Sequence, residues 1–210
     1  MPRVVVISDT HMLHRMLDVP DGDIAIHCGD WSSADEISQY EDFFSWYSAL
    51  PHRHKILVAG NHESLMSGFG KIMRRKIPSN ISYLEDRRTI INGLKFWGSP
   101  RTVGFQWMAF THRKIDHPER IWAAIPEDTD VLVTHGPPYG ILDRNYGGQH
   151  IGDRDLLERV QQIGPRLHLF GHVHDDNGEL VQDGTHFINA AVGDDDEDPN
   201  LSARIHVVDV

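Results

Sequence analysis

Five short segments of the chain combine aspartate, asparagine and histidine in patterns that could bind metal ions. They are Asp9-Thr10-His11, Gly29-Asp30, Gly60-Asn61-His62-Glu63, Thr134-His135-Gly136 and Gly171-His172-Val173-His174. As ligands they offer two aspartates, one asparagine and four histidines, and His62 is left over. This set is large enough to hold two neighbouring metal ions. Such a pair of ions stabilises both the attacking and the leaving oxygen of a phosphoryl transfer. The segments therefore predict phosphoryl-transfer chemistry.

The spacing within the segments suggests how each side chain would be used. In Asp9-Thr10-His11 and in His172-Val173-His174, two ligands are separated by one residue, so an extended backbone would place both on one side. Asp30 has two carboxylate oxygens and could bridge two cations. Asn61 would add a neutral oxygen ligand, which limits the negative charge near a phosphate. The adjacent His62 would face the substrate and could donate a proton, because histidine titrates near neutrality.

Each segment also has an ordinary structural explanation when it is taken alone. The segments at 9–11 and 29–30 could be simple turns, and 60–63 could be a strand-to-helix turn with a capping side chain. His135 could be a buried histidine with a structural partner. We favour metal binding because five matches, each following an apolar strand-like run, are hard to reconcile with coincidence.

The apolar runs that precede the ligand segments predict buried parallel strands at 4–7, 24–27, 56–59, 130–134 and 167–170. Further strands are expected near 81–84, 89–91, 94–97, 179–182, 185–189 and 204–209, with Asn92-Gly93 as a hairpin turn. Since ligand sites in α/β sheets gather outside the carboxyl ends of strands, the ligand segments should meet there. The order of elements predicts mixed sheets covered by helices in one domain over residues 1–210.

Three helices are expected from apolar spacing and capping signals. A capping box formed by Ser33 and Glu36 would start the first, which reaches about residue 50. His117-Pro118-Glu119 would open a short second helix. Asp153 would cap the third, which Gly164-Pro165 ends. The stretch 64–78 is expected to be partly helical, although Gly68 and Gly70 weaken that pattern.

Composition narrows the classes of protein. The chain has 210 residues, 40% of them hydrophobic, and a formal net charge of -11. This acidity argues against binding to duplex nucleic acid or to an anionic membrane. A single cysteine, Cys28, excludes an intrachain disulfide and fits a reducing compartment. No apolar stretch approaches the roughly 20 residues that span a bilayer, and no signal peptide is evident, so a cytoplasmic protein is expected.

Other chemistries lack their signatures. The sequence contains no phosphate-binding loop of the Gly-x-x-x-x-Gly-Lys type, and Gly68-Phe69-Gly70 lacks the third glycine of a dinucleotide fingerprint. No Gly-x-Ser-x-Gly nucleophile elbow is present. We interpret Cys28 as a packing residue and not as a nucleophile.

In this order, the five segments resemble the calcineurin-like metallophosphoesterase superfamily: Asp-x-His, Gly-Asp, Gly-Asn-His-Glu, a single His and Gly-His-x-His. The match runs from Val4 to about Val208. Three further stretches resemble one branch, the small metallophosphoesterase-domain-containing proteins akin to class III cyclic nucleotide phosphodiesterases. These stretches are Thr134-His135-Gly136-Pro137-Pro138-Tyr139-Gly140, 167–174 and Phe187-Ile188-Asn189-Ala190, and the aromatic insert that begins Trp97-Gly98-Ser99-Pro100 is similar.

The resemblance implies a four-layer α/β/β/α sandwich of two mixed sheets flanked by helices, with two metal ions at one edge. It implies one ion held by Asp9, His11, Asp30 and His174, and a second held by Asn61, His135, His172 and the shared Asp30. His62 would be the catalytic histidine. Manganese is the favoured metal, with iron, zinc and cobalt as alternatives, because mixed nitrogen and oxygen ligands suit all four.

The expected activity is hydrolysis of a phosphodiester, such as a cyclic nucleotide, by in-line attack of a hydroxide that bridges the two metals. Ser/Thr phosphatases and dinucleoside tetraphosphatases carry Asp-Arg-Gly soon after Gly-Asp; here Trp31-Ser32-Ser33-Ala34 follows, which argues against both. A phosphomonoesterase, a nuclease and a nucleotide-binding or scaffold protein with little turnover remain alternatives.

The substrate is expected to be a small phosphoester, and the insert at 99–116 has two interpretations. Its side chains could form a rim that stacks a base and contacts phosphate, or the insert could be a packed flap. Its candidate residues are Arg101, Phe105, Trp107 and Phe110, with Tyr146 and His150 as further candidates elsewhere.

Overall fold

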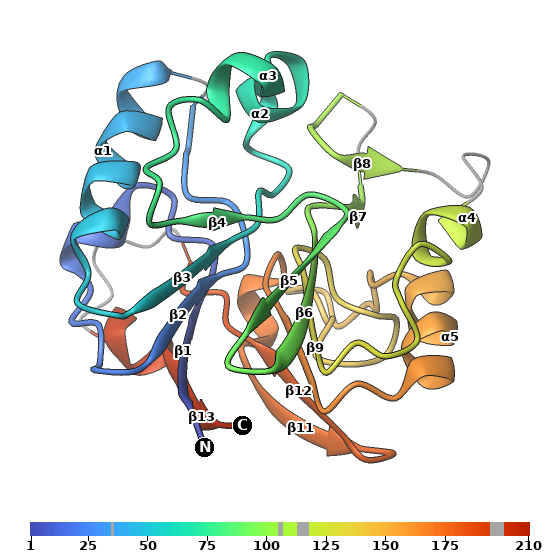
Figure 1. Ribbon diagram of the computed structural model, residues 1–210. Coiled ribbons are helices and arrows are strands. Elements are labelled where there is room, and N and C mark those ends of the chain that lie inside the picture. The colour runs from blue at the N-terminus through green and yellow to red at the C-terminus, as the bar shows by residue number, and fades with distance from the viewer. Residues whose placement is uncertain (35, 105–106, 113–117, 194–199) are drawn as a thin grey trace.

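The computed structural model describes residues 1–34, 36–104, 107–112, 118–193 and 200–210. Its centre consists of two large mixed β-sheets that face each other (Figure 1). The first sheet has the strand order β13-β1-β2-β3-β4, and the second has the order β11-β12-β10-β9-β6-β5. A separate pair, β7 (Thr102–Val103) and β8 (Thr111–His112), lies in the insert at 99–116, for which the sequence predicted no strands.

The first sheet contains four parallel strands and one antiparallel edge strand. Its strands are β1 (Arg3–Ile7), β2 (Ile24–His27), β3 (His54–Leu57), β4 (Ser82–Tyr83) and β13 (His206–Asp209). Strands β1 to β4 run parallel, and β13 pairs antiparallel with β1 in the register Arg3 to Asp209. This pairing brings the two ends of the chain side by side (Figure 1).

The second sheet combines parallel central strands with antiparallel edges. Its strands are β5 (Arg87–Ile91), β6 (Leu94–Ser99), β9 (Val131–Thr134), β10 (Leu167–Phe170), β11 (Gly178–Gln182) and β12 (Thr185–Asn189). Strands β6, β9, β10 and β12 are parallel neighbours. The expected hairpin joins β5 to β6 through Asn92 and Gly93, whose φ values of 53° and 84° match the turn that this dipeptide favours.

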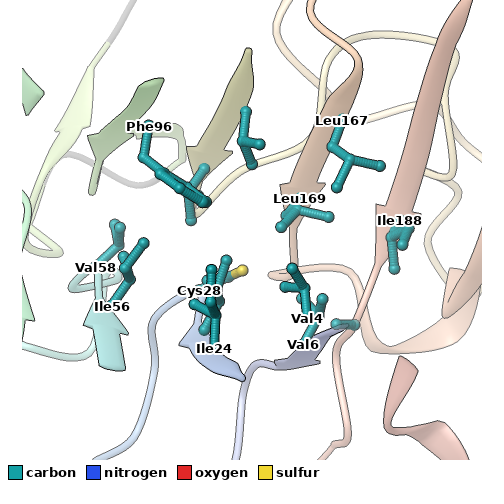
Figure 2. Packing of buried hydrophobic residues seen from close by; sticks show 14 of the residues in the cluster. Val4, Val6, Ile24, Cys28, Ile56, Val58, Phe96, Leu167, Leu169 and Ile188 are labelled. Atoms are coloured by element: carbon teal, nitrogen blue, oxygen red, sulfur yellow. The ribbon is translucent and has the colours of Figure 1, made fainter. Parts of the chain in front are cut away.

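A large cluster of apolar side chains fills the layer between the sheets. Figure 2 shows side chains of β1, β2 and β3 facing those of β6, β10 and β12. Cys28 is fully buried in this layer, which agrees with its interpretation as a packing residue. Burial on both faces explains why these strands read as continuous apolar runs in the sequence.

Helices cover the outer face of each sheet (Figure 1). Outside the first sheet lie α1 (Ile37–Ala49), α2 (Ser64–Gly68) and α3 (Gly70–Met73), which share a buried cluster with residues of β2 and β3. Outside the second sheet lie α4 (Pro118–Trp122) and α5 (Arg154–Ile163), which pack on β9, β10 and β12. The expected four-layer α/β/β/α sandwich is therefore confirmed.

The start of α1 and the start of β3 differ from the sequence prediction. The Ser33–Glu36 capping box is wrong, because α1 begins at Ile37 and Glu36 makes no side-chain cap. The Ser33 hydroxyl instead donates to the carbonyl oxygen of His11 at 2.9 Å. The third strand of the first sheet begins two residues earlier than expected, at His54.

Other boundaries agree with the prediction. The Asp153 carboxylate accepts hydrogen bonds from the amides of Asp155 and Leu156 at the start of α5, and Gly164 ends that helix with a φ of 53°. The expected opening residue His117 lies outside the described residues. Within the described ranges, none of the helices has both the length and the apolar character needed to cross a membrane.

Candidate metal centre

The predicted ligand segments meet at one edge of the sandwich. Strands β1 and β2 are parallel neighbours and end just before Asp9 and Asp30, and β3 leads to Asn61. In the second sheet the parallel strands β9 and β10 end just before His135 and His172. The backbone amide of His172 donates to the Asp9 carboxylate at 2.8 Å, which ties the two sheets together at this edge.

Six of the seven predicted ligands fall into two compact groups. One group contains Asp9, His11 and His174, and the other contains Asp30, His135 and His172; within each, the ligand atoms lie within 4.8 Å of one another. The Asn61 side-chain oxygen lies 2.9 Å from Nε2 of His135, which places Asn61 beside the second group. The structure thus brings the predicted ligands together in two groups; that each group holds an ion, and that Asp30 is shared, stays a prediction.

The ligand turns are not extended, contrary to the sequence prediction. Asp9, His11, Asp30 and His172 adopt left-handed backbone conformations, with φ values of 54°, 39°, 54° and 71°. Such conformations are uncommon for residues other than glycine and typically occur at functional sites, where the surrounding structure enforces them. His172 and His174 therefore reach two different groups through a sharp turn and not through alternation along a strand.

Three glycines make room for the ligands. A Cβ atom on Gly60 would lie 2.3 Å from Oδ1 of Asp30, and one on Gly29 would lie 2.5 Å from Nδ1 of His135. A Cβ atom on Gly171 would lie 2.0 Å from Oδ2 of Asp9. The glycines that accompany the ligands in the sequence are thus explained by close approach.

Hydrogen bonds from outside the two groups fix the histidine rings. Nδ1 of His135 lies 3.1 Å from the carbonyl oxygen of Cys28, and Nδ1 of His11 lies 3.3 Å from that of Ser32. A carbonyl oxygen can only accept, so each ring donates through Nδ1 and directs its Nε2 toward the other candidate ligands.

Glu63, to which the sequence analysis assigned no role, holds together the ligand turns that follow β2 and β3. Its fully buried carboxylate accepts hydrogen bonds from the amides of Asp30 at 2.9 Å, Ser32 at 3.0 Å and Gly60 at 2.7 Å. The Ser32 hydroxyl donates to it at 2.9 Å. The sequence offered one signal for this role, which is the position of Glu63 at the end of the motif at 60–63.

The buried carboxylates and imidazoles strongly affect one another. Burial acts to raise the pKa of Asp9 and Asp30, but the neighbouring histidines, His174 and His135 first among them, outweigh burial and lower both pKa values, that of Asp30 to about 2. Burial together with the charge of Asp30 raises the pKa of Glu63 to about 8. The centre thus keeps the two predicted aspartate ligands ionised.

The arrangement suits a cation in the first group. Nε2 of His11 and Nε2 of His174 face each other at 3.3 Å, and the buried Oδ1 of Asp9 lies 3.5 Å from Nε2 of His174. Two imidazole nitrogens and a buried carboxylate oxygen form a donor set that divalent transition metals prefer. The buried charge of Asp9 would then be compensated.

The two groups open into a cleft of about 570 Å³. The lining residues are His11, Asp30, Ser33, Asn61, His62, Asn145, Ile151, His172, Val173, His174 and Asp175. The ring of His62 lies edge-to-face against that of His11, with ring centroids 4.9 Å apart. The backbone amide of His62 donates to Oδ1 of Asp30 at 2.8 Å, which fixes its turn next to the ligands.

The predicted aromatic rim is only partly assembled. Nε of Arg101 pairs with the Asp86 carboxylate at 2.9 Å, and Phe110 packs against the cluster beneath α1. Trp107 is 79% exposed, and Phe105 lies outside the described residues. Strand β7 (Thr102–Val103) pairs with β8 (Thr111–His112), and the Ala109 amide donates to the carbonyl oxygen of Asn61 at 3.1 Å. These contacts favour the flap interpretation of the described part.

Tyr146 and His150, the other two candidates for substrate contact, differ in their surroundings. Tyr146 is 96% exposed, while His150 contacts the buried carboxylate of Asp143 through Nδ1. Neither belongs to the described lining of the cleft, although the neighbouring residues Asn145 and Ile151 do. The loop that carries them therefore borders the cleft.

The fold and the clustered ligand residues define a metal-dependent phosphoesterase, and the family comparison agrees. A calcineurin-like phosphoesterase family model matches residues 2–176. The chain belongs to this family.

Curated relatives support the branch that the sequence resembles. The chain is 38% identical to UPF0046 protein K07C11.7 of Caenorhabditis elegans, over 90% of this chain and 69% of that protein. It is 33% identical to Metallophosphoesterase domain-containing protein 1 of Homo sapiens, over 90% of this chain and 66% of that protein. The chain thus spans about two thirds of the length of these relatives.

Solved structures support the fold. One aligns with a TM-score of 0.69 and 16% identity over 90% of this chain and 91% of its own. The protein TT1561 of Thermus thermophilus aligns with a TM-score of 0.60 and 13% identity over 99% of this chain and 98% of its own.

Proposed function

We propose that this chain is a dinuclear metal-dependent phosphodiesterase that hydrolyses a small phosphodiester, with nucleotides as the first candidates. The observation that carries the proposal is the pair of adjacent three-ligand groups at the floor of one open cleft. When bound, two divalent cations supply the Lewis acidity and charge neutralisation that in-line displacement at phosphorus requires.

The proposed ligands are those expected from the sequence. Asp9, His11 and His174 would hold one ion, and Asn61, His135 and His172 the other, with Asp30 shared. Support comes from the grouping of their ligand atoms and from the carbonyl oxygens that orient two of the rings. Manganese remains the favoured metal, with iron, zinc and cobalt as alternatives, since the donor set suits all four.

We assign His62 the role of proton donor to a phosphoryl oxygen or to the leaving group. Its ring lines the cleft beside the first ligand group and has no place in either group of ligand atoms. The hydrogen bond from its backbone amide to Asp30 would keep the ring in register with the bound ester.

We further propose that residues 1–210 form one domain and that the protein is cytoplasmic. The apolar cluster shared by both sheets supports the first point, and the single cysteine supports the second. The net charge of -11 disfavours duplex nucleic acid as the substrate.

The first test compares two chromogenic esters, bis(4-nitrophenyl) phosphate and 4-nitrophenyl phosphate. Protein stripped with a chelator would be assayed before and after addition of Mn²⁺, with bound metal measured by mass spectrometry. We expect turnover that depends on Mn²⁺ and favours the diester. A preference for the monoester would contradict the diesterase assignment. Bound metal without turnover of either ester would favour a nucleotide-binding or scaffold role.

A further inference from the structure

The residues that line the cleft come from two sides of the molecule. The turns after the strands of the first sheet contribute His11, Asp30, Ser33, Asn61 and His62, most of them assigned above to the metal centre. The loops of the second sheet contribute His172 and His174 and four residues without an assigned role. These four are Asn145, Ile151, Val173 and Asp175, and we call them the selector face.

The selector face is held by polar contacts, one of which is buried. The side-chain amide of Asn189 donates to the carbonyl oxygens of Leu142 at 3.0 Å and Val173 at 2.8 Å, which joins the loop before Asn145 to the ligand turn. The amide of Arg144 donates to the Asp176 carboxylate at 2.8 Å. Two elements that meet at the cleft are therefore fastened to each other, as expected for a surface that positions a substrate group.

A second set of contacts fixes the far end of the same loop. The buried carboxylate of Asp143 accepts hydrogen bonds from the amides of Gly140 and Gly152, both at 2.9 Å. This places Ile151, which is 37% exposed, at a defined position on the cleft.

The charge of the selector face is unusual for a site that receives phosphate. It carries one carboxylate, on the exposed residue Asp175, and no lysine or arginine is found among the described residues that line the cleft. The nearby Arg204 donates to the carbonyl oxygen of His174, and Arg154 lies over the ring of Tyr139, 3.4 Å from its centroid. Neither belongs to the lining.

We propose that the selector face restricts the substrate to phosphodiesters whose second organic group carries no negative charge, and that Asp175 excludes a second anionic group. The inference rests on the proposed diesterase activity. The scissile phosphate would occupy the metal side, while Ile151 offers apolar contact and Asn145 an amide to the organic group. A pyrophosphate, a polyphosphate or a phosphorylated oligonucleotide would bring a second charge towards Asp175, and the described residues that line the cleft include no lysine or arginine to receive it.

The expected size of the effect follows from Coulomb's law. Two unit charges about 7 Å apart in water-like surroundings change a rate constant roughly threefold at 25 °C. The effect should shrink at about 1 M salt, where charges are screened within about 3 Å.

The experiment uses the Mn²⁺-loaded full chain and three diesters of similar shape. These are 4-nitrophenyl phenyl phosphate and its 4-carboxyphenyl and 4-(trimethylammonio)phenyl analogues, which carry a neutral, a negative and a positive second group. The variant is Asp175→Asn, and Asp18→Asn, an exposed aspartate that does not line the cleft, is the matched control. For each ester, the kcat/KM of the wild type is divided by that of the variant. This ratio removes the differences in intrinsic reactivity among the three esters.

Taking the change for the phenyl ester as the reference, we expect Asp175→Asn to raise kcat/KM roughly threefold for the carboxyphenyl ester and to lower it roughly threefold for the cationic ester. The control variant should behave as the wild type. Equal ratios for the three esters would overturn the role of Asp175 while leaving the diesterase proposal intact. Absence of turnover of the phenyl ester by the metal-loaded wild type would refute the diesterase proposal and the inference with it.

Discussion

The edge of the sandwich that holds the metal centre and the layer between the sheets are built on opposite principles. The layer is built on a cluster of apolar side chains, most of them from strands with regular pairing. The edge buries Asp9, Asp30 and Glu63 and holds several turns in left-handed conformations. Buried charge and left-handed backbone conformations each destabilise the folded state, whereas the burial of apolar side chains stabilises it.

The contrast shows that stability and chemistry are separated along the same strands. Strand β2 packs Ile24 and Ile26 between the sheets and, three residues after it ends, presents Asp30 to the cleft. Substitutions at the edge should therefore change metal binding and turnover with little loss of fold, and substitutions in the layer should do the reverse. The following predictions test this separation, beginning with the largest expected effect.

Asp30→Ala should abolish most turnover while the fold is retained. The variant loses the ligand proposed to be shared by both ions, which removes several kcal/mol of transition-state stabilisation, or about 10³-fold in kcat. Hydrolysis of bis(4-nitrophenyl) phosphate, metal content and circular dichroism would be measured together, with Asp18→Ala as the control. An active variant that still binds two metals would contradict the assignment.

Gly60→Ala should produce a similar loss of metal and activity, because its Cβ atom would lie 2.3 Å from the Asp30 carboxylate and 2.6 Å from the His135 ring. Gly68→Ala is the matched control, since no atom lies within 4 Å of the added methyl group. Metal content measured by mass spectrometry should fall only in the first variant. Full metal binding by Gly60→Ala would show that the centre is looser than these distances indicate.

Leu169→Ala should lower the free energy of unfolding by about 3 kcal/mol, because it leaves a cavity in the layer between the sheets. Denaturant unfolding would measure the change, and Leu180→Ala, which truncates a side chain that is 37% exposed, should cost far less. Turnover per folded molecule should match the wild type. A loss of activity at temperatures where Leu169→Ala is folded would break the separation between the two regions.

His62→Ala should keep both metals and slow turnover about 10²-fold, as expected for removal of a proton donor. Metal content and kcat would be determined on the same samples. If metal were lost together with activity, His62 would be a ligand or a support for one, and its assigned role would be wrong.

The smallest effect concerns pH and a buried histidine in the second sheet. Burial lowers the pKa of His168 to about 3, and its Nε2 lies 2.9 Å from the hydroxyl of Thr134, which itself donates to a carbonyl oxygen. Because the folded pKa lies below the unfolded value, the unfolded chain binds more protons once the pH falls below about 6.5. Stability contributed by neutral His168 is therefore present above that pH and lost below it.

Between pH 7 and pH 5, the wild type should lose about 2 kcal/mol more unfolding free energy than His168→Gln, which retains a donor but does not titrate. Urea unfolding at several pH values would measure this difference. Parallel curves for the two proteins would show that His168 does not control stability in this range.

Much of the fold could be predicted because buried parallel strands leave a clear apolar pattern. The strands Ile24–His27, Leu167–Phe170 and Thr185–Asn189 have the bounds that the sequence predicted. Local polar signals were less dependable. Asp153 caps α5 as expected, but Ser33 contacts the backbone of His11 and does not cap α1, because the tertiary structure offered its hydroxyl another acceptor.

By itself, the sequence determined which side chains are available for metal chemistry and which runs of residues must be buried. Residue type and order are sufficient for this, since ligand chemistry and apolar character are properties of the side chains. Only the tertiary structure decided that His172 and His174 belong to different groups and that Glu63 joins two ligand turns. It also decided that Asp175 borders the cleft. These relations depend on left-handed turns and on contacts between segments more than 30 residues apart, which strand pairing within a sheet and the packing of the two sheets bring together.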